Sequence, residues 1–244
     1  MRRRLVACAA AAALAAVALA GCGGGAGGGS GSASVWATRD DGGTRLAVGS
    51  VPAGLNAIQA LDRVAKITTR YGGRYVQSVD GVAGSASARH DWFLYVNGYE
   101  ADRGGVEITL HDGDIAWWDF HDWSRSESLL VAGAFPEPFL HGYGGSRRDV
   151  HVLYASPGLA GAARRIGKTV GATAVRPVAD DAPAGANVVV LREGPERVRL
   201  SFRAGDGAAT RPGDPVQLVI SGIAAARLAA DPAAYRYRYE VGPP

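Results

Sequence analysis

The 244-residue sequence predicts an α+β protein, with two small units of strands and helices behind an N-terminal export segment. Three observations support this interpretation. The first 21 residues are charged and then apolar, and a Gly/Ser-rich stretch follows as far as residue 34. Patterns typical of strands and helices alternate over residues 35–124 and again over residues 149–244. Between them, residues 125–148 hold two prolines and several aromatic residues, a composition typical of a connector.

The N-terminal segment has the organisation of a bacterial export signal. Arg2 to Arg4 are followed by apolar residues 5–20, a run shorter than the roughly 20 residues that span a bilayer. The run ends in Leu-Ala-Gly-Cys, which resembles the lipobox of bacterial lipoproteins. The resemblance implies a signal peptide over residues 1–21, a lipid on Cys22, and a flexible tether over residues 22–34. The alternative is an ordinary signal or short anchor with an incidental cysteine.

The net charge of +3 comes from the export segment. Residues 5–144 carry 9 basic and 14 acidic groups, whereas residues 145–244 carry 14 basic and 9 acidic groups. We therefore expect no nucleic-acid partner, and we expect the two oppositely charged halves to attract each other.

Residues 35–124 favour a mixed sheet with one helix. Strands are expected at residues 35–39 and 44–51, and a helix from Gly54 to about Thr69, because Leu55, Ile58, Leu61 and Ala65 recur near 3.6-residue spacing. Four more strands are expected at residues 75–79, 92–96, 106–110 and 115–123. This order is typical of a β-grasp fold, in which the helix packs across one face of the sheet.

Two motifs in this unit carry a family resemblance. Residues 92–98 have the sequence WFLYVNG, and residues 110–120 have the sequence LHDGDIAWWDF. They resemble the bacterial domain family that is similar to the C-terminal β-domain of transcobalamin and intrinsic factor. In those carriers the domain covers one face of a corrin ring. The resemblance therefore implies a binding domain for a corrinoid or another flat small molecule.

The strand expected at residues 115–123 has two different faces, because alternate residues of a strand point in opposite directions. Ala116, Trp118 and Phe120 form an apolar face that we assign to the core. The other face can bind a ligand through its aromatic and polar groups, or can be covered by the second unit. The expected ligand-binding residues are Trp92, Tyr99, Trp117, Asp119 and His121.

The same region is rich in histidine and aspartate, which are ligands for zinc or iron. The candidates are His111, Asp112, Asp114, Asp119, His121 and Asp122. However, Gly113 and Asp114 match the structural turn of the family, and His121 and Asp122 point to opposite faces of a strand. We therefore expect no metal and no resident cofactor.

Residues 149–244 predict a small α/β unit of no recognised family. Strands are expected at residues 149–154, 173–178, 187–191, 198–202, 216–220 and 235–239, and helices at 157–170 and 224–230. In the last strand, tyrosines would share one face and arginines the other. The connector at residues 125–148 either clamps the boundary between the units or forms a ligand-binding lip.

The sequence does not point to catalysis. No cysteine follows Cys22, and Ser156 and Ser221 lack the surroundings of a nucleophile elbow. Residues 161–169 resemble a phosphate loop but have five residues between the glycines, where that loop needs four. We expect a non-catalytic, exported, lipid-anchored protein at the cell membrane that binds a small molecule beside a transporter. The alternative is an envelope module that docks a protein or a glycan without a small-molecule ligand.

Overall fold

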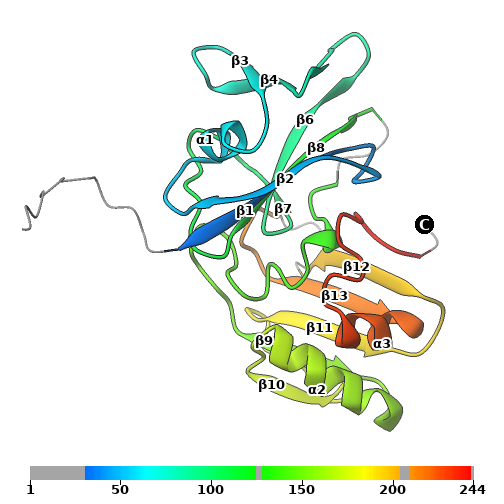
Figure 1. Ribbon diagram of the computed structural model, residues 1–244. Helices are drawn as coiled ribbons and strands as arrows, with labels where there is room; N and C mark the ends of the chain where they lie inside the picture. The colour runs from blue at the N-terminus through cyan, green and yellow to red at the C-terminus, as the bar shows by residue number, and fades with distance from the viewer. Residues whose placement is uncertain (1–30, 125–127, 204–208, 243–244) are drawn as a thin grey trace, which may run out of the picture.

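The computed structural model describes residues 31–124, 128–203 and 209–242. The expected signal peptide, Cys22 and most of the expected tether lie outside the described residues. The described end of the expected tether is wrong, because residues 32–34 belong to the first strand. Figure 1 shows two β-rich units joined by the connector, with few and short helices. No helix in the described ranges is both long and apolar enough to cross a membrane.

The first unit is built on a five-stranded sheet in the order β2-β1-β8-β6-β7. Its strands are β1 (Ser32–Arg39), β2 (Thr44–Pro52), β6 (His90–Val96), β7 (Tyr99–Glu100) and β8 (Ile115–Asp122). The two central strands, β1 and β8, run parallel, and the other neighbours are antiparallel. This central pairing joins segments of chain that are about 80 residues apart.

One helix, α1 (Ala57–Asp62), packs on one face of this sheet. Asn56 caps it, because its side chain accepts a hydrogen bond from the Gln59 amide while the Gln59 side chain accepts one from the Asn56 amide. The prediction of a helix as far as Thr69 was wrong. The chain instead enters a three-stranded sheet of β3 (Ile67–Arg70), β4 (Tyr75–Val79) and β5 (Val82–Ala83). The β-branched residues that open β3 favour a strand over a helix.

The prediction of a strand at residues 106–110 was also wrong. Ile108 and Leu110 are buried in the core beside α1, as their alternation suggested. Their backbone groups, however, bond to the start of the helix: the Leu110 amide donates to the Leu55 carbonyl, and the Ala57 amide donates to the Ile108 carbonyl. The segment therefore fixes the helix rather than extending the sheet.

The second unit is a five-stranded sheet in the order β10-β9-β11-β13-β12. Its strands are β9 (Val150–Tyr154), β10 (Ala174–Pro177), β11 (Asn187–Arg192), β12 (Arg197–Phe202) and β13 (Val216–Ser221). All neighbours are parallel except the antiparallel pair β12 and β13. The helices α2 (Ala160–Thr169) and α3 (Ile223–Ala230) pack on it, and a 3-10 turn at Pro157–Leu159 precedes α2. The predicted α/β pattern agrees with this arrangement.

The prediction of a closing strand at residues 235–239 was wrong, although the tyrosines there are half-buried and the two arginines are exposed, as the alternation predicted. The C-terminal segment, residues 231–242, forms turns, with Tyr237 at a φ of 66°. Tyr237 packs edge-on against Trp36 at 4.8 Å, and Tyr239 packs against Trp117 at 5.4 Å between ring centroids. Burial of these rings against the first sheet outweighs the β propensity of tyrosine.

The connector lies along the boundary between the two units, which we call the seam. Phe135 and Phe139 are buried in the core of the second unit, whereas Val131 packs with Trp36 and Trp117 of the first. A short 3-10 helix, η1 (Ala132–Ala134), separates these contacts. The connector therefore clamps the seam, which is the first of the two roles considered above; the second role, a ligand-binding lip, stays a prediction.

Candidate functional site

Three of the predicted ligand-binding residues lie together on one face of β8. Trp117, Asp119 and His121 are 0%, 0% and 5% exposed. The C-terminal segment covers them, chiefly through Tyr239. The face is therefore covered by a later part of the chain, which was one of the two alternatives, and the role of these residues in binding stays a prediction.

Asp119 is the centre of a buried hydrogen-bond network. The parallel pairing of β1 and β8 places Thr38 opposite Asp119. Oδ1 of Asp119 accepts hydrogen bonds from the Thr38 hydroxyl and from the Gly42 amide, the latter at 3.1 Å. Thr38 in turn accepts a hydrogen bond of 2.7 Å from Nε1 of Trp117. Oδ1 of Asp119 thus bonds both to β1 and to the turn between β1 and β2.

The other oxygen of Asp119, Oδ2, faces His121 and Tyr239. The Tyr239 hydroxyl lies 2.9 Å from this oxygen and 3.1 Å from Nδ1 of His121, and Nδ1 is 3.1 Å from Oδ2. Burial, together with the nearby Tyr95 and Asp119, raises the pKa of Tyr239 well above its ordinary range. The hydroxyl therefore keeps its proton at neutral pH and donates to the carboxylate.

A second carboxylate reaches the same place from the turn between β1 and β2. The ligand atoms of Asp41, Asp119 and His121 all lie within 4.8 Å of one another. Asp41 is exposed and has a φ of 54°, a left-handed conformation that aspartate tolerates better than most residues. Two carboxylates and an imidazole in this arrangement are able to hold a metal ion.

The two other predicted ligand-binding residues lie elsewhere. Trp92 is buried on the α1 face of the sheet, where its Nε1 donates a 3.0 Å hydrogen bond to the Val82 carbonyl. Tyr99 is buried at the seam, and its hydroxyl donates a 2.9 Å hydrogen bond to the Asp214 carbonyl. Burial raises the pKa of Tyr99, so this donor is also protonated at neutral pH.

The remaining histidine and aspartate candidates hold turns. Asp114 accepts hydrogen bonds of 2.7 Å from the Asn97 side chain and from the His111 amide. Asp112 accepts from the Ser32 amide and Asp122 from the Ser124 amide. These contacts agree with the structural interpretation of the Gly113–Asp114 turn.

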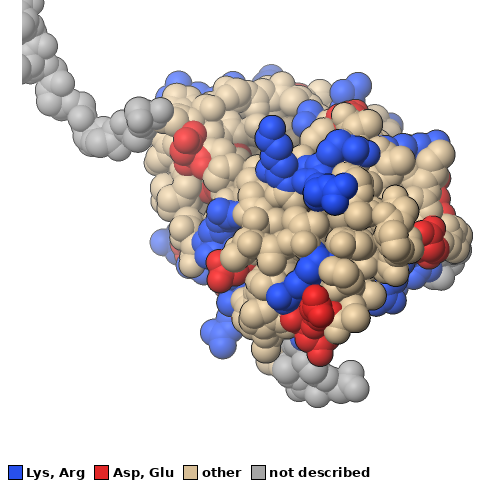
Figure 2. Space-filling model, turned by 90° about the horizontal axis from the view of Figure 1, so that it is seen from below, with Lys and Arg blue, Asp and Glu red and all other residues tan. Residues whose placement is uncertain are grey.

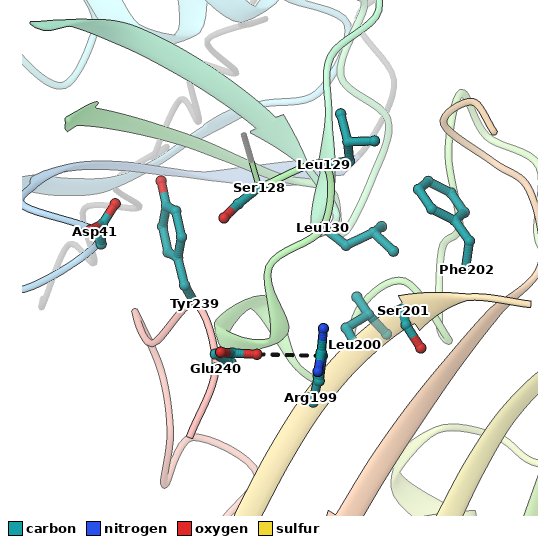
Figure 3. A pocket seen from close by; sticks show the side chains of 10 residues that line it. All are labelled: Asp41, Ser128, Leu129, Leu130, Arg199, Leu200, Ser201, Phe202, Tyr239 and Glu240. Atoms are coloured by element: carbon teal, nitrogen blue, oxygen red, sulfur yellow. Dashed lines mark ion pairs between the residues drawn. The ribbon is translucent and has the colours of Figure 1, made fainter. Parts of the chain in front are cut away.

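An open pocket of about 500 Å³ lies at the seam beside the buried network, and we call it the seam pocket. Figure 3 shows Asp41 and Tyr239 at one end and Phe202 at the other, with Leu129 and Leu130 between the backbones of the two units. The ion pair between Arg199 and Glu240, at 3.5 Å, lies along its edge. The remaining lining residues are Ser128, Leu200 and Ser201.

The sequence interpretation missed Thr38, Asp41 and Tyr239. Thr38 and Asp41 gain their positions from the pairing of β1 with β8, which no local pattern reveals. Tyr239 belongs to a tyrosine-rich stretch that was noted, but as a strand. The density of aromatic residues in that stretch was the one signal that pointed to a docked segment.

The seam is aromatic and hydrogen-bonded rather than simply a meeting of opposite charges. The guanidinium of Arg236 lies 5.4 Å from the ring of Trp36, and that of Arg45 lies 5.6 Å from the ring of Tyr237. On the face shown in Figure 2, Lys and Arg side chains are scattered and interleaved with Asp and Glu. The predicted attraction between the two halves through net charge stays a prediction.

Comparison with known proteins adds a domain assignment. No curated protein matches the chain. A solved structure from Ruminococcus gnavus ATCC 29149, described as "a putative metal binding protein", is similar at 12% identity and a TM-score of 0.29; the match covers 38% of this chain and 97% of that one. A likeness at that level carries no argument about this protein. Residues 54–122, which run from just before α1 to the end of β8, match the family model of a domain of unknown function, DUF4430.

Proposed function

We propose that this is a non-catalytic binding protein, anchored by lipid on the outer face of the cell membrane, that holds a flat small molecule in the seam pocket. The observation that carries the proposal is the pocket itself. Its volume of about 500 Å³ lies in the range typical of small-molecule sites, and its two ends differ in polarity.

The lining suggests the chemistry of the ligand. Leu129, Leu130 and Phe202 offer apolar surface, and Leu129 is 48% exposed although it is a large aliphatic residue. Asp41 offers a carboxylate at the other end. A molecule with a flat apolar part and a hydroxyl or amino group fits both ends. A corrinoid is larger than the pocket and would enter it by one edge.

Four of the predicted ligand-binding residues do not line the pocket but contact residues that do. Trp117, Asp119 and His121 contact Tyr239, and Tyr99 packs against Phe202 at 6.2 Å between ring centroids. They position the two aromatic walls. Because Trp117 packs on Tyr239, a ligand that touches Tyr239 changes the surroundings of Trp117.

Two matched variants test the site with Nile red, a flat uncharged dye. We expect saturable binding by the wild-type protein, about tenfold weaker binding by Leu129→Asp because charge enters the apolar end, and unchanged binding by Ile223→Asp. Ile223 is 55% exposed on α3, outside the pocket lining, so it receives the same substitution in a similar setting. Non-saturable binding, or an equal loss in both variants, would contradict the proposed site.

Hydroxocobalamin in equilibrium dialysis tests the corrinoid version separately. Retention by the wild-type protein that Leu129→Asp reduces supports a corrinoid ligand. No retention at about 50 μM would exclude a corrinoid ligand, and the proposal would then be restricted to a smaller flat molecule.

The proposed anchoring rests on the sequence around Cys22. Replacing Cys22 with alanine should move the protein from the membrane fraction to the soluble fraction of an expressing bacterium, because the lipid-bearing residue is lost. An unchanged membrane fraction would contradict the anchor.

We also propose that the first unit is a β-grasp domain. The strand order β2-β1-β8-β6-β7, the parallel central pair and a helix packed across one face support this assignment. An experimental structure of another DUF4430 domain with the same strand order would strengthen the β-grasp assignment, and one with a different strand order would contradict it.

A further inference from the structure

We propose that Asp41, Asp119 and His121 form a binding site for a first-row transition metal ion, beside the seam pocket. The site goes beyond the proposed small-molecule function and does not depend on it. It also departs from the expectation of no metal that the sequence alone supported.

The spacing of the ligand atoms suits a small ion. Nδ1 of His121 lies 3.1 Å from Oδ2 of Asp119. Two ligands of a tetrahedral zinc ion, each about 2.0–2.1 Å from the metal, are separated by about 3.3 Å. A carboxylate oxygen of Asp41 lies within 4.8 Å of a ligand atom of Asp119 and of a ring nitrogen of His121, so a rotation of its exposed side chain would complete a three-ligand set.

The buried pair is held in place before any ion arrives. Oδ1 of Asp119 is engaged by Thr38 and Gly42, which directs Oδ2 toward His121. The imidazole of His121 stacks on Phe93, with ring centroids 4.2 Å apart and planes 18° apart. The Tyr239 hydroxyl bonds to Oδ2 and so acts as a positioning group for Asp119. Such supporting contacts commonly change metal affinity by about 10–100-fold.

Asp41 supplies the third ligand and the access route. The Gly42 amide donates a 3.1 Å hydrogen bond to Asp119, which ties the turn carrying Asp41 to the buried ligand itself. Because Asp41 also lines the seam pocket, an ion at this site has a route from solvent and a coordination position open to water. A cation between the carboxylates offsets their mutual repulsion.

The ligand chemistry selects the class of metal. One imidazole and two carboxylates suit zinc or a similar first-row ion, whereas calcium needs six to eight oxygen ligands. Magnesium prefers octahedral coordination by oxygen, which an imidazole does not provide. Zinc is therefore the first probe, and cobalt(II) is its spectroscopic substitute.

Calorimetric titration of the untagged, chelator-treated protein with Zn²⁺ tests the site. We expect one binding site with a Kd below about 10 μM, and cobalt(II) should give the visible absorption of a tetrahedral complex. Asp41→Asn should weaken binding about tenfold or more, because asparagine keeps the turn but loses the charge. Asp40→Asn is the matched control, since Asp40 sits on the same turn, also has positive φ and pairs with Arg39 at the surface. Its binding should equal that of the wild type.

His121→Gln should also abolish the cobalt spectrum, and circular dichroism verifies that this variant is folded. Absence of saturable zinc binding below about 100 μM, or an equal effect of Asp40→Asn and Asp41→Asn, would overturn the proposal. The Nile red titration needs no metal, so failure of the metal site is distinguishable from failure of the small-molecule site.

Discussion

The two faces of β8 are buried by different means. Ala116 and Trp118 face the core beneath α1, an element of the same unit, and the contacts there are apolar. Trp117, Asp119 and His121 face Tyr239 of the C-terminal segment, 118 to 122 residues further along the chain, through ring packing and hydrogen bonds. Nε1 of Trp117 donates to Thr38, whereas Nε1 of Trp118 finds no hydrogen-bond partner among the described residues.

The difference shows which face is specialised. An apolar face under a local helix needs nothing but packing to be stable. A buried carboxylate and imidazole are costly to desolvate, and an apolar replacement is often equally stable. A network of this kind, next to an open pocket, is what the proposed binding role predicts.

The largest expected effect is a loss of stability on either face of β8, which is accompanied by proteolysis of the C-terminal segment only for the polar face. Asp119→Ala should lower the free energy of unfolding by about 3–5 kcal/mol, because it leaves buried donors without an acceptor. It should also loosen the C-terminal segment, so that trypsin cleaves the chain after Arg236 and Arg238, two exposed residues of that segment. Leu94→Ala, beneath α1, should cost about 2–5 kcal/mol without that cleavage. Urea unfolding and limited proteolysis measure both, and equal cleavage of the two variants would contradict the comparison.

The two neighbouring tryptophans offer a closer test. Trp117→Phe should destabilise the protein by about 2 kcal/mol, since it removes both buried surface and the hydrogen bond to Thr38. Trp118→Phe should cost only about 1 kcal/mol, since the N–H that it removes has no partner. Chemical unfolding of both variants measures the difference. A greater cost at Trp118 would reverse the assignment of the polar face.

The tyrosines of the C-terminal segment should differ in a smaller way. Tyr239→Phe loses the hydrogen bond to Asp119 and should cost about 1 kcal/mol. Tyr237→Phe keeps the ring against Trp36 and should change the free energy of unfolding by less than about 0.5 kcal/mol. Equal effects in thermal unfolding would mean that ring packing alone holds the segment.

The smallest effect concerns a buried polar group outside this network. Burial lowers the pKa of His151 on β9, and Arg176 and Arg203 lower it further against the opposing effect of Asp149. Below about pH 6.5 the unfolded chain binds a proton that the folded protein does not, so stability is lost as pH falls. His151→Leu should flatten this loss between about pH 7 and 5 in urea unfolding. An unchanged pH profile would show that His151 is not the source of this loss of stability.

The local pattern of apolar and polar residues was sufficient to predict which residues of β8 lie on its apolar face. The alternation of residues 115–123 predicted which side chains share each face, because a strand has a fixed period of two. Most strands and the helices of the second unit were predicted for the same reason. The helix expected as far as Thr69 was too long, because its apolar spacing continued past the point where β-branched residues begin β3.

Long-range packing explains the rest. Cover of the Trp117 face was one of the two alternatives, but the covering segment was predicted as a strand because Tyr235 to Tyr239 alternates like one. In the structure these residues form turns that pack against Trp36 and Trp117. Asp41 joins His121 only because β1 pairs with β8 across about 80 residues of sequence. Neither contact can be predicted from the local pattern of apolar and polar residues.

The indole N–H signals of Trp117 and Trp118 test the central claim most directly. These two groups lie on opposite faces of β8, so ¹⁵N-labelled protein reports on both faces in one titration with Nile red. Binding in the seam pocket predicts a saturable shift of the Trp117 signal, through Tyr239, while the Trp118 signal stays in place. A shift at Trp118 with none at Trp117, or no shift at either, would contradict the account.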